Sequence, residues 1–191
     1  MHPLISGRWS ARGYDATATL SDDDLDTILD AGRWAPTWGR VQPVRFVVGK
    51  RGDATFAALS DTLNRGNKTW APAATALILL CTTDDPDDAD LHEYGGVDVG
   101  LALSQMILQS EALGYNGHPM AGFSKAAARE AFAVPEKLRP MVVLAVGKPA
   151  DDPSTLDEAI RERDAWPRER LPLTEIAYAG AWGEPYRADD A

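Results

Sequence analysis

The sequence predicts an α+β fold with one central sheet of three or four strands. Three short apolar runs read as strands, and helical patterns lie among them without strict βαβ alternation. The runs occupy residues 44–48, 73–81 and 141–146. A chain of 191 residues, 45% hydrophobic and 25% charged, can bury one core without staples. We therefore expect a single domain over residues 1–191.

The clearest helix is predicted to begin after Ser21. This serine can cap the helix, and the three acidic residues that follow lie at the positive end of the helix dipole. Leu25, Ile28 and Leu29 have the spacing of one buried face, and Pro36 is expected to end the helix at about residue 34. Two further helices are predicted to start at Asp53 and at Ser124.

A longer helix is predicted over residues 97–113, and it is apolar on nearly every side. Such a helix must be covered all round, and Gly100 would permit a close approach by another helix. A second subunit is one source of that cover. The alternative is a central helix enclosed within one subunit.

The last part of the chain, residues 151–191, has little periodicity and few apolar residues. It is too poor in apolar residues to fold alone. We expect it to be a C-terminal extension that wraps over the core or over a partner subunit.

Charge and composition exclude several classes of protein. A formal net charge of −10 argues against nucleic acid as a partner. No apolar run approaches the roughly 20 residues that a membrane-spanning helix needs, and the first residues lack the apolar segment of a signal peptide. A single cysteine, Cys81, fits a reducing compartment, so the expected location is the cytoplasm.

The usual catalytic signatures are missing. Three scattered histidines and one cysteine give no metal-ligand spacing, and neither a nucleophile elbow nor a phosphate-binding glycine loop is present. Such a chain can still be an enzyme if a cofactor supplies the reactive atoms. Arginines near both chain ends suggest one anion site assembled from distant segments, at positions 8, 12, 161, 163, 168 and 170.

Four segments together resemble the nitroreductase family of FMN proteins. Residues 8–15 (RWSARGYD) are similar to its RxSxR/K motif, and residues 35–43 (APTWGRVQP) to its APSxxNxQP segment. Residues 114–123 (GYNGHPMAGF) match its PxxGF turn, and residues 168–176 (RERLPLTEI) its late basic element. The segments occur in the family's order and span nearly the whole chain. The resemblance implies a mostly antiparallel sheet flanked by helices, in an intertwined homodimer.

The resemblance also implies which residues hold the cofactor. Arg8, Arg168 and Arg170 would surround the FMN phosphate with Ser10, because the planar guanidinium fork suits phosphate oxygens. Arg12 would reach the pyrimidine edge of the flavin. The full set of implied cofactor contacts is Arg8, Trp9, Ser10, Arg12, Pro36, Thr37, Trp38, Arg40, Pro119, Met120, Ala121, Gly122, Arg168 and Arg170.

Within the turn, Pro119, Met120, Ala121 and Gly122 would pack along the flavin ring and offer it a main-chain N–H. His118 beside the turn is either a proton donor or, as we favour, a packed or exposed side chain. The segment from Pro36 to Arg40 is implied to reach the flavin of the other subunit.

One departure from the family pattern concerns the substrate pocket. Arg40 stands where the family usually has asparagine, and Trp38 replaces a small residue. We hypothesise that Arg40 pairs with an anionic substrate or cofactor phosphate, or that it occludes the pocket and narrows the activity.

The implied activity is an FMN-dependent oxidoreductase. It would take hydride from NADH or NADPH and pass electrons, by a ping-pong mechanism, to a small acceptor such as a nitroaromatic, quinone or enone. The flavin carries the chemistry, so no side chain is assigned as a catalytic acid or base. Two alternatives stay open: a flavin-dependent dehydrogenase or oxidase that desaturates a small metabolite or peptide, and a non-catalytic flavin-binding or sensing protein.

Overall fold

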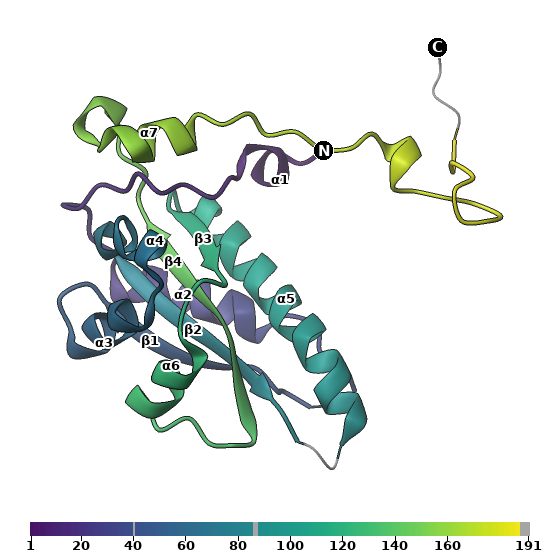
Figure 1. Cartoon of the computed structure of the whole chain (residues 1–191), viewed down its shortest axis with the longest axis horizontal. Coiled ribbons are helices and arrows are strands. Elements are labelled where there is room, and N and C mark those ends of the chain that lie inside the picture. Colours follow the sequence, from purple (N-terminus) through teal and green to yellow (C-terminus); the bar gives the residue numbers. More distant parts are fainter. Residues whose placement is uncertain (40, 86–87, 188–191) are drawn as a thin grey trace.

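The computed structural model describes residues 1–39, 41–85 and 88–187, so the predictions for Arg40 fall outside the described residues. Four strands form one sheet in the order β1-β2-β4-β3, and every neighbouring pair is antiparallel (Figure 1). The strands are β1 (Arg45–Lys50), β2 (Ala76–Thr83), β3 (Asn116–Met120) and β4 (Leu138–Gly147). The predicted α+β class and the three apolar strands are confirmed.

The strand β3 is the one that apolar patterning does not predict. Its sequence, NGHPM, contains two residues that disfavour strands, a glycine and Pro119. β3 lies at the edge of the sheet and pairs only with β4. Proline is tolerated there because an edge strand does not need a ladder hydrogen bond from every N–H.

Four helices pack on the two faces of this sheet, out of seven α-helices in the described residues. The seven are α1 (Pro3–Gly7), α2 (Asp22–Arg33), α3 (Ala54–Thr62), α4 (Arg65–Lys68), α5 (Ala89–Ala112), α6 (Lys125–Ala131) and α7 (Glu158–Asp164). Short 3-10 turns occur at Ala71–Ala73, Pro153–Thr155 and Leu173–Glu175.

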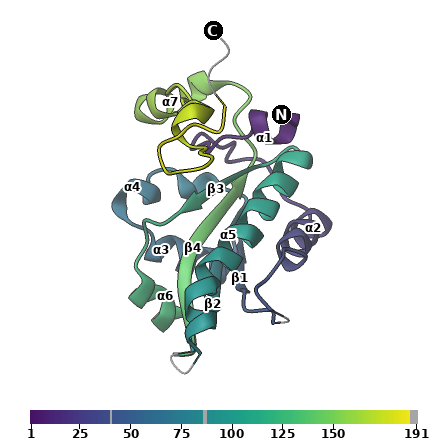
Figure 2. The same cartoon turned by 90° about the vertical axis from the view of Figure 1, so that its right-hand side faces the viewer.

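Alternate residues of β2 enter two different hydrophobic cores, since successive side chains of a strand point to opposite faces. Leu77 and Leu79 pack with residues of α3 and α6, whereas Ile78 and Leu80 pack with residues of α2 and α5. The same division into layers can be followed in Figure 2. The continuous apolar run in β2 is therefore explained by a helical layer on each face.

The predicted helix starts are confirmed by their caps. The side chains of Ser21, Asp53 and Ser124 each accept a hydrogen bond from a backbone N–H three residues on, at 3.0, 2.6 and 3.1 Å. The long helix α5 begins earlier than predicted, at Ala89, where Asp88 caps it. Its first two turns are polar and glycine-containing, so they lack the apolar pattern that indicated the rest.

The helix α5 is covered on one side only within this chain. Val99 and Met106 are buried, but Val97 and Leu101 on the other side are 55% and 39% exposed. Enclosure within one subunit is therefore not what the chain shows. The exposed side is available to a partner.

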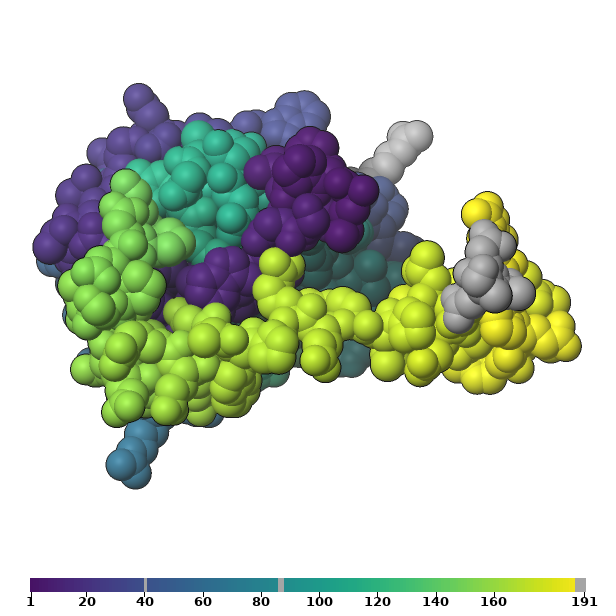
Figure 3. Space-filling model, turned by 90° about the horizontal axis from the view of Figure 1, so that it is seen from above, coloured from purple at the N-terminus to yellow at the C-terminus, as the bar shows by residue number. Residues whose placement is uncertain are grey.

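The C-terminal extension begins against the domain and then leaves it. α7 lies beside the N-terminal segment, while residues 165–187 run past α1 and beyond the body of the domain (Figure 3). Large apolar side chains are exposed along this part, namely Trp166, Leu171, Leu173, Ile176, Trp182 and Tyr186. In the described residues, no helix combines the length and apolar character needed to cross a membrane.

Replacing Gly49 by alanine should destabilise the fold by about 1–3 kcal/mol, because the new methyl group would overpack the core. A Cβ at Gly49 would lie 2.4 Å from the backbone nitrogen of Phe56, and the strand β1 and helix α3 would have to separate. Urea denaturation measures the loss. The control is Gly66→Ala, where a Cβ meets nothing within 4 Å; equal stability of the two variants would contradict the close packing.

Candidate functional site

The segment that carries the predicted RxSxR motif is held against the edge strand β3 by side chains. Asn116 accepts a hydrogen bond from the Ala11 N–H at 3.1 Å and donates one to the Trp9 carbonyl at 2.7 Å. His118, two residues along the strand, lies with its Nδ1 2.8 Å from the Ala11 carbonyl. Trp9 and Ala11 consequently pack on the core, while Arg8 stays partly exposed.

His118 is a packed histidine, as we favoured from the sequence. Its ring is 8% exposed and its centroid lies 4.4 Å from that of Trp70. Burial lowers the pKa of His118, which favours the neutral ring. Because a carbonyl can only accept, Nδ1 carries the proton and donates a hydrogen bond to the Ala11 carbonyl.

The C-terminal extension contacts the N-terminal segment beside Arg8. Arg168 donates hydrogen bonds to the carbonyls of Ser6 at 2.9 Å and Gly7 at 3.4 Å, which directly precede Arg8. The Nε of Arg8 is buried and finds no hydrogen-bond acceptor among the described residues. A buried donor without a partner is costly, so this guanidinium is suited to an anion supplied from outside the chain.

The Glu111 carboxyl group interacts electrostatically with both Arg8 and Arg168. Burial raises the pKa of Glu111, while its hydrogen bond from Asn116 and the charges of Arg8 and Arg168 oppose the increase. Both guanidinium groups therefore act on one place beside the C-terminal end of α5. Arg8 also lines a pocket of about 360 Å³ against residues 100–108 of α5, but neither Glu111 nor Arg168 is among its lining residues. The pocket is lined by Ile5, Arg8, Gly100, Leu103, Ser104, Ile107 and Leu108.

Not every predicted phosphate ligand joins this pair. Arg170 is exposed, and its guanidinium donates to the carbonyl of the neighbouring Glu169. Ser10 is partly exposed, between the two residues that Asn116 holds. Arg12 is paired with Asp164 of α7, 3.8 Å away.

The predicted turn is fixed through its backbone. The Gly122 carbonyl accepts hydrogen bonds from the Asn67 side chain at 3.0 Å and from the Asn64 N–H at 2.9 Å. Pro119 and Met120 are the last residues of β3, and the Met120 side chain is buried in the core. Met120 is therefore enclosed by the protein, whereas Ala121, the next residue of the turn, is exposed.

The segment around Trp38 lies elsewhere in the chain. The Trp38 N–H donates to the buried carboxylate of Asp98 at 2.9 Å, and its ring stacks on Tyr94 at 5.6 Å. Both partners belong to the first half of α5, about 20 Å (Asp98) and about 25 Å (Tyr94) along the helix from Glu111 at 1.5 Å per residue. One chain therefore does not bring Pro36, Thr37 and Trp38 together with the arginine pair.

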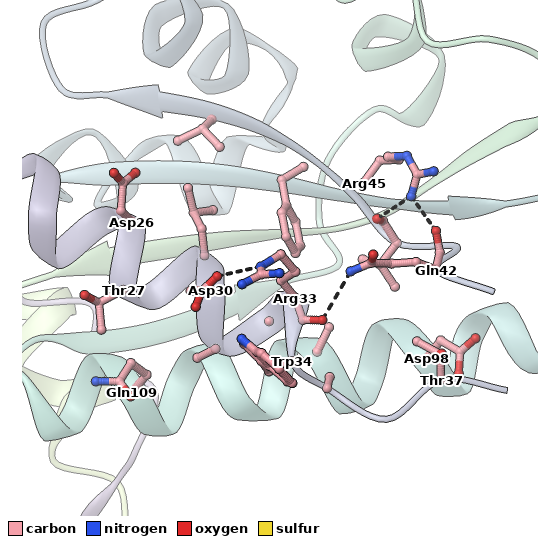
Figure 4. A pocket seen from close by; sticks show the side chains of 18 residues that line it. Asp26, Thr27, Asp30, Arg33, Trp34, Thr37, Gln42, Arg45, Asp98 and Gln109 are labelled. Atoms are coloured by element: carbon pink, nitrogen blue, oxygen red, sulfur yellow. Dashed lines mark hydrogen bonds and ion pairs between the residues drawn. The ribbon is translucent and has the colours of Figure 1, made fainter. Parts of the chain in front are cut away.

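A second, larger pocket borders the Trp38 segment, since Thr37 and Asp98 line it, but it includes neither arginine of the pair. It has a volume of about 1030 Å³ and lies between α2, β1 and α5. Asp30 pairs with Arg33, and the Gln42 side chain donates to the Arg33 carbonyl at 3.2 Å (Figure 4). Of the predicted site residues that the structure describes, only Thr37 lines this pocket.

Three residues that position the site carry no signal in the sequence patterns. Asn116, Asp98 and Asp164 each accept hydrogen bonds from the backbone of a segment far away in sequence. Only the position of Asn116 within the GYNGHPM segment, beside residues of the family motif, could have pointed to a role.

Comparison with known proteins places this fold and this order of motifs in one class. A model described as the Nitroreductase family matches residues 5–63 and 49–148. The chain belongs to the nitroreductase family. An uncharacterized 15.4 kDa protein encoded in the ask 5' region of Mycolicibacterium smegmatis is 44% identical over 150 residues, covering 74% of this chain and 99% of that protein.

Solved structures show the same fold. A structure described as an oxidoreductase containing FMN has a TM-score of 0.86 and 30% identity, with 96% of this chain and 93% of that one covered. A nitroreductase family protein from Clostridium difficile 630 has a TM-score of 0.71 and 26% identity, with 95% and 99% covered. The predicted antiparallel sheet flanked by helices is confirmed.

Replacing Asn116 by alanine should lower the free energy of unfolding by about 2–4 kcal/mol. The variant removes the side chain that satisfies the Trp9 carbonyl and the Ala11 N–H, and lost buried hydrogen bonds cost about 1–3 kcal/mol each. Chemical denaturation measures the change. Asn64→Ala is the matched control, because Asn64 is exposed and its side chain makes no capping bond. Equal midpoints for the two variants would refute the role of Asn116.

Proposed function

We propose that this protein is an FMN-dependent oxidoreductase that works as a homodimer. The observation that carries the proposal is the contact of the C-terminal extension with the N-terminal segment at Arg8. The buried Nε of Arg8 lacks an acceptor among the described residues, and Arg168 lies alongside. The similar structure described as an oxidoreductase containing FMN supports the choice of anion. The residues fit a phosphate monoester attached to a larger, partly apolar molecule.

Within this proposal each segment has a separate task. Arg8 and Arg168 hold the phosphate, and Arg12 lies at the pyrimidine edge of the ring. The backbone of the turn at Ala121 and Gly122, kept in place by Asn67, lies along the ring. Bound FMN supplies a ring that accepts hydride at one nitrogen, and the protein binds it, orients it and excludes water.

The proposed electron donor is NADH or NADPH, which leaves before the acceptor binds. The relative YdgI of Bacillus subtilis, provisionally named an NAD(P)H nitroreductase, is 24% identical over 185 residues and supports this choice. We propose a nitroaromatic, quinone or enone as the acceptor. Because His118 is buried and its Nδ1 is bonded to Ala11, solvent is the proton source in this proposal.

The protein should be yellow when purified without added cofactor, and its flavin absorbance should bleach when NADH or NADPH is added without oxygen. Difference spectra measure both effects and identify the donor. A colourless protein that also fails to bind added FMN would refute the proposed cofactor. A bound flavin that no nicotinamide reduces would instead favour the sensing or the oxidase alternative, which oxygen uptake with candidate substrates separates.

Incompletely covered surfaces of the single chain support the proposed dimer. The apolar side of α5 is uncovered at Val97 and Leu101, and residues 165–187 leave the domain with apolar side chains exposed. The segment at Trp38 lies far along α5 from the arginine pair of its own chain. We propose that a second copy covers α5, receives the extension and brings its own Trp38 segment to the flavin.

Leu101→Asp should convert the dimer into a monomer, because a buried charge without a partner costs several kcal/mol at an interface. Size-exclusion chromatography with light scattering measures the mass. Ala57→Asp, at an exposed position of α3, is the matched control and should remain dimeric. A wild-type chain that is monomeric at micromolar concentration would contradict the proposed assembly.

A further inference from the structure

One carboxylate of the C-terminal extension is bound to the RxSxR segment. The side chain of Asp164, the last residue of α7, accepts hydrogen bonds from the Arg12 N–H at 3.0 and 3.1 Å and from the Gly13 N–H at 2.8 Å. It also lies 3.8 Å from the Arg12 guanidinium, and the Asp164 side chain is only 12% exposed. A single group thus holds the backbone and the side chain of one arginine.

The backbone is built for this close approach. A Cβ at Gly13 would lie 2.2 Å from a terminal methyl carbon of Leu156 and 3.2 Å from the Asp164 carboxylate, so any larger residue would displace these side chains of the extension. The Gly13 carbonyl accepts a hydrogen bond from the Ala150 N–H at 2.9 Å. Residues 12 and 13 are consequently enclosed by the segment that follows β4.

The attachment of α7 does not depend on Asp164 alone. Ile160, one turn earlier in the same helix, packs against the hydrophobic core that includes Tyr14. Leu156 contacts the position of Gly13. The apolar contacts of Ile160 and Leu156 already attach this segment to the domain. The polar contacts of Asp164 therefore serve to fix the position of Arg12.

The segment is held from two sides at successive positions. Asn116 of β3 binds residues 9 and 11, and Asp164 of α7 binds residues 12 and 13. The carboxylate is occupied by two N–H groups and a guanidinium, so little of its negative charge remains directed at a neighbouring anion.

We propose that Asp164 is a positioning residue for the flavin, acting through Arg12. It keeps the Arg12 guanidinium at the pyrimidine edge of the ring, so that the extension on the outside of the domain sets the affinity of the cofactor site. This inference rests on the proposed function, since it assigns Arg12 to bound FMN.

The test is a double-mutant cycle on FMN affinity, measured by quenching of FMN fluorescence. Asp164→Ala should weaken FMN binding about tenfold or more in the wild-type background, because hydrogen bonds to charged groups are lost. In an Arg12→Ala background the same change should have less than about a twofold effect, because residues that act through one another are not additive. Asp164→Asn, which keeps an acceptor for the N–H groups, should lose less.

The control is Glu162→Ala, which removes an exposed carboxylate from the same helix and should leave FMN affinity unchanged. Circular dichroism melts establish that each variant is folded, and if Asp164→Ala is not, the cycle is run with Asp164→Asn. Equal losses in both backgrounds, or no loss in either, would overturn the positioning role. A wild-type protein that binds no FMN would instead overturn the proposed function.

Discussion

The hydrogen bonds of the Asn116 amide are the interaction on which the rest of the candidate site depends. Residues 8–12 belong to no strand, and buried backbone groups in such a segment need partners from side chains. Asn116 supplies both a donor and an acceptor, and so takes the place of a neighbouring strand. Asn116 is itself placed by the sheet, where it pairs opposite Gly147 of β4. The Tyr14 ring packs directly over Gly147, in the space that the Cβ of any larger residue would occupy. The register of the sheet therefore determines where the segment that carries Arg8 and Arg12 lies.

The parts of the fold that could be predicted are those in which local pattern and burial agree. β2 and β4 are apolar because helices cover both faces, and Ser21, Asp53 and Ser124 mark helix starts by a local hydrogen bond. β3 could not be predicted in this way, because its residues have low strand propensity. Asn116 and His118 instead bind the backbone of residues 9 and 11. The early start of α5 was missed for a related reason. Gly95 interrupts the apolar pattern in the sequence, although it lies inside the helix. A Cβ at this position would lie 2.7 Å from the Thr82 hydroxyl oxygen.

The candidate site was predictable as a set of motifs, but not as a set of contacts. Resemblance to a family identified Arg8 and Arg168, and the structure places Arg168 against the residues that precede Arg8. It could not separate residues whose side chains face a ligand from residues such as Met120, whose side chain is in the core. The positioning residues Asp98 and Asp164 escaped prediction because an acid that binds a distant backbone has no local pattern. Trp38 depends on a second chain in the proposal, and one sequence does not show which surfaces meet.

A protein with a net charge of −10 can still build an anion site because the relevant charges are local. Two acidic residues, Glu111 and Asp164, lie among the arginines. Glu111 accepts a hydrogen bond from Asn116, which binds the backbone of residues 9 and 11, and Asp164 binds the backbone of residues 12 and 13 directly. Burial raises the pKa of Glu111. An anion placed beside a carboxylate raises its pKa further, because the two negative charges repel. If the phosphate binds at Arg8 as proposed, protonation of Glu111 and anion binding must favour each other, and by linkage lower pH strengthens binding as long as the phosphate keeps its charge.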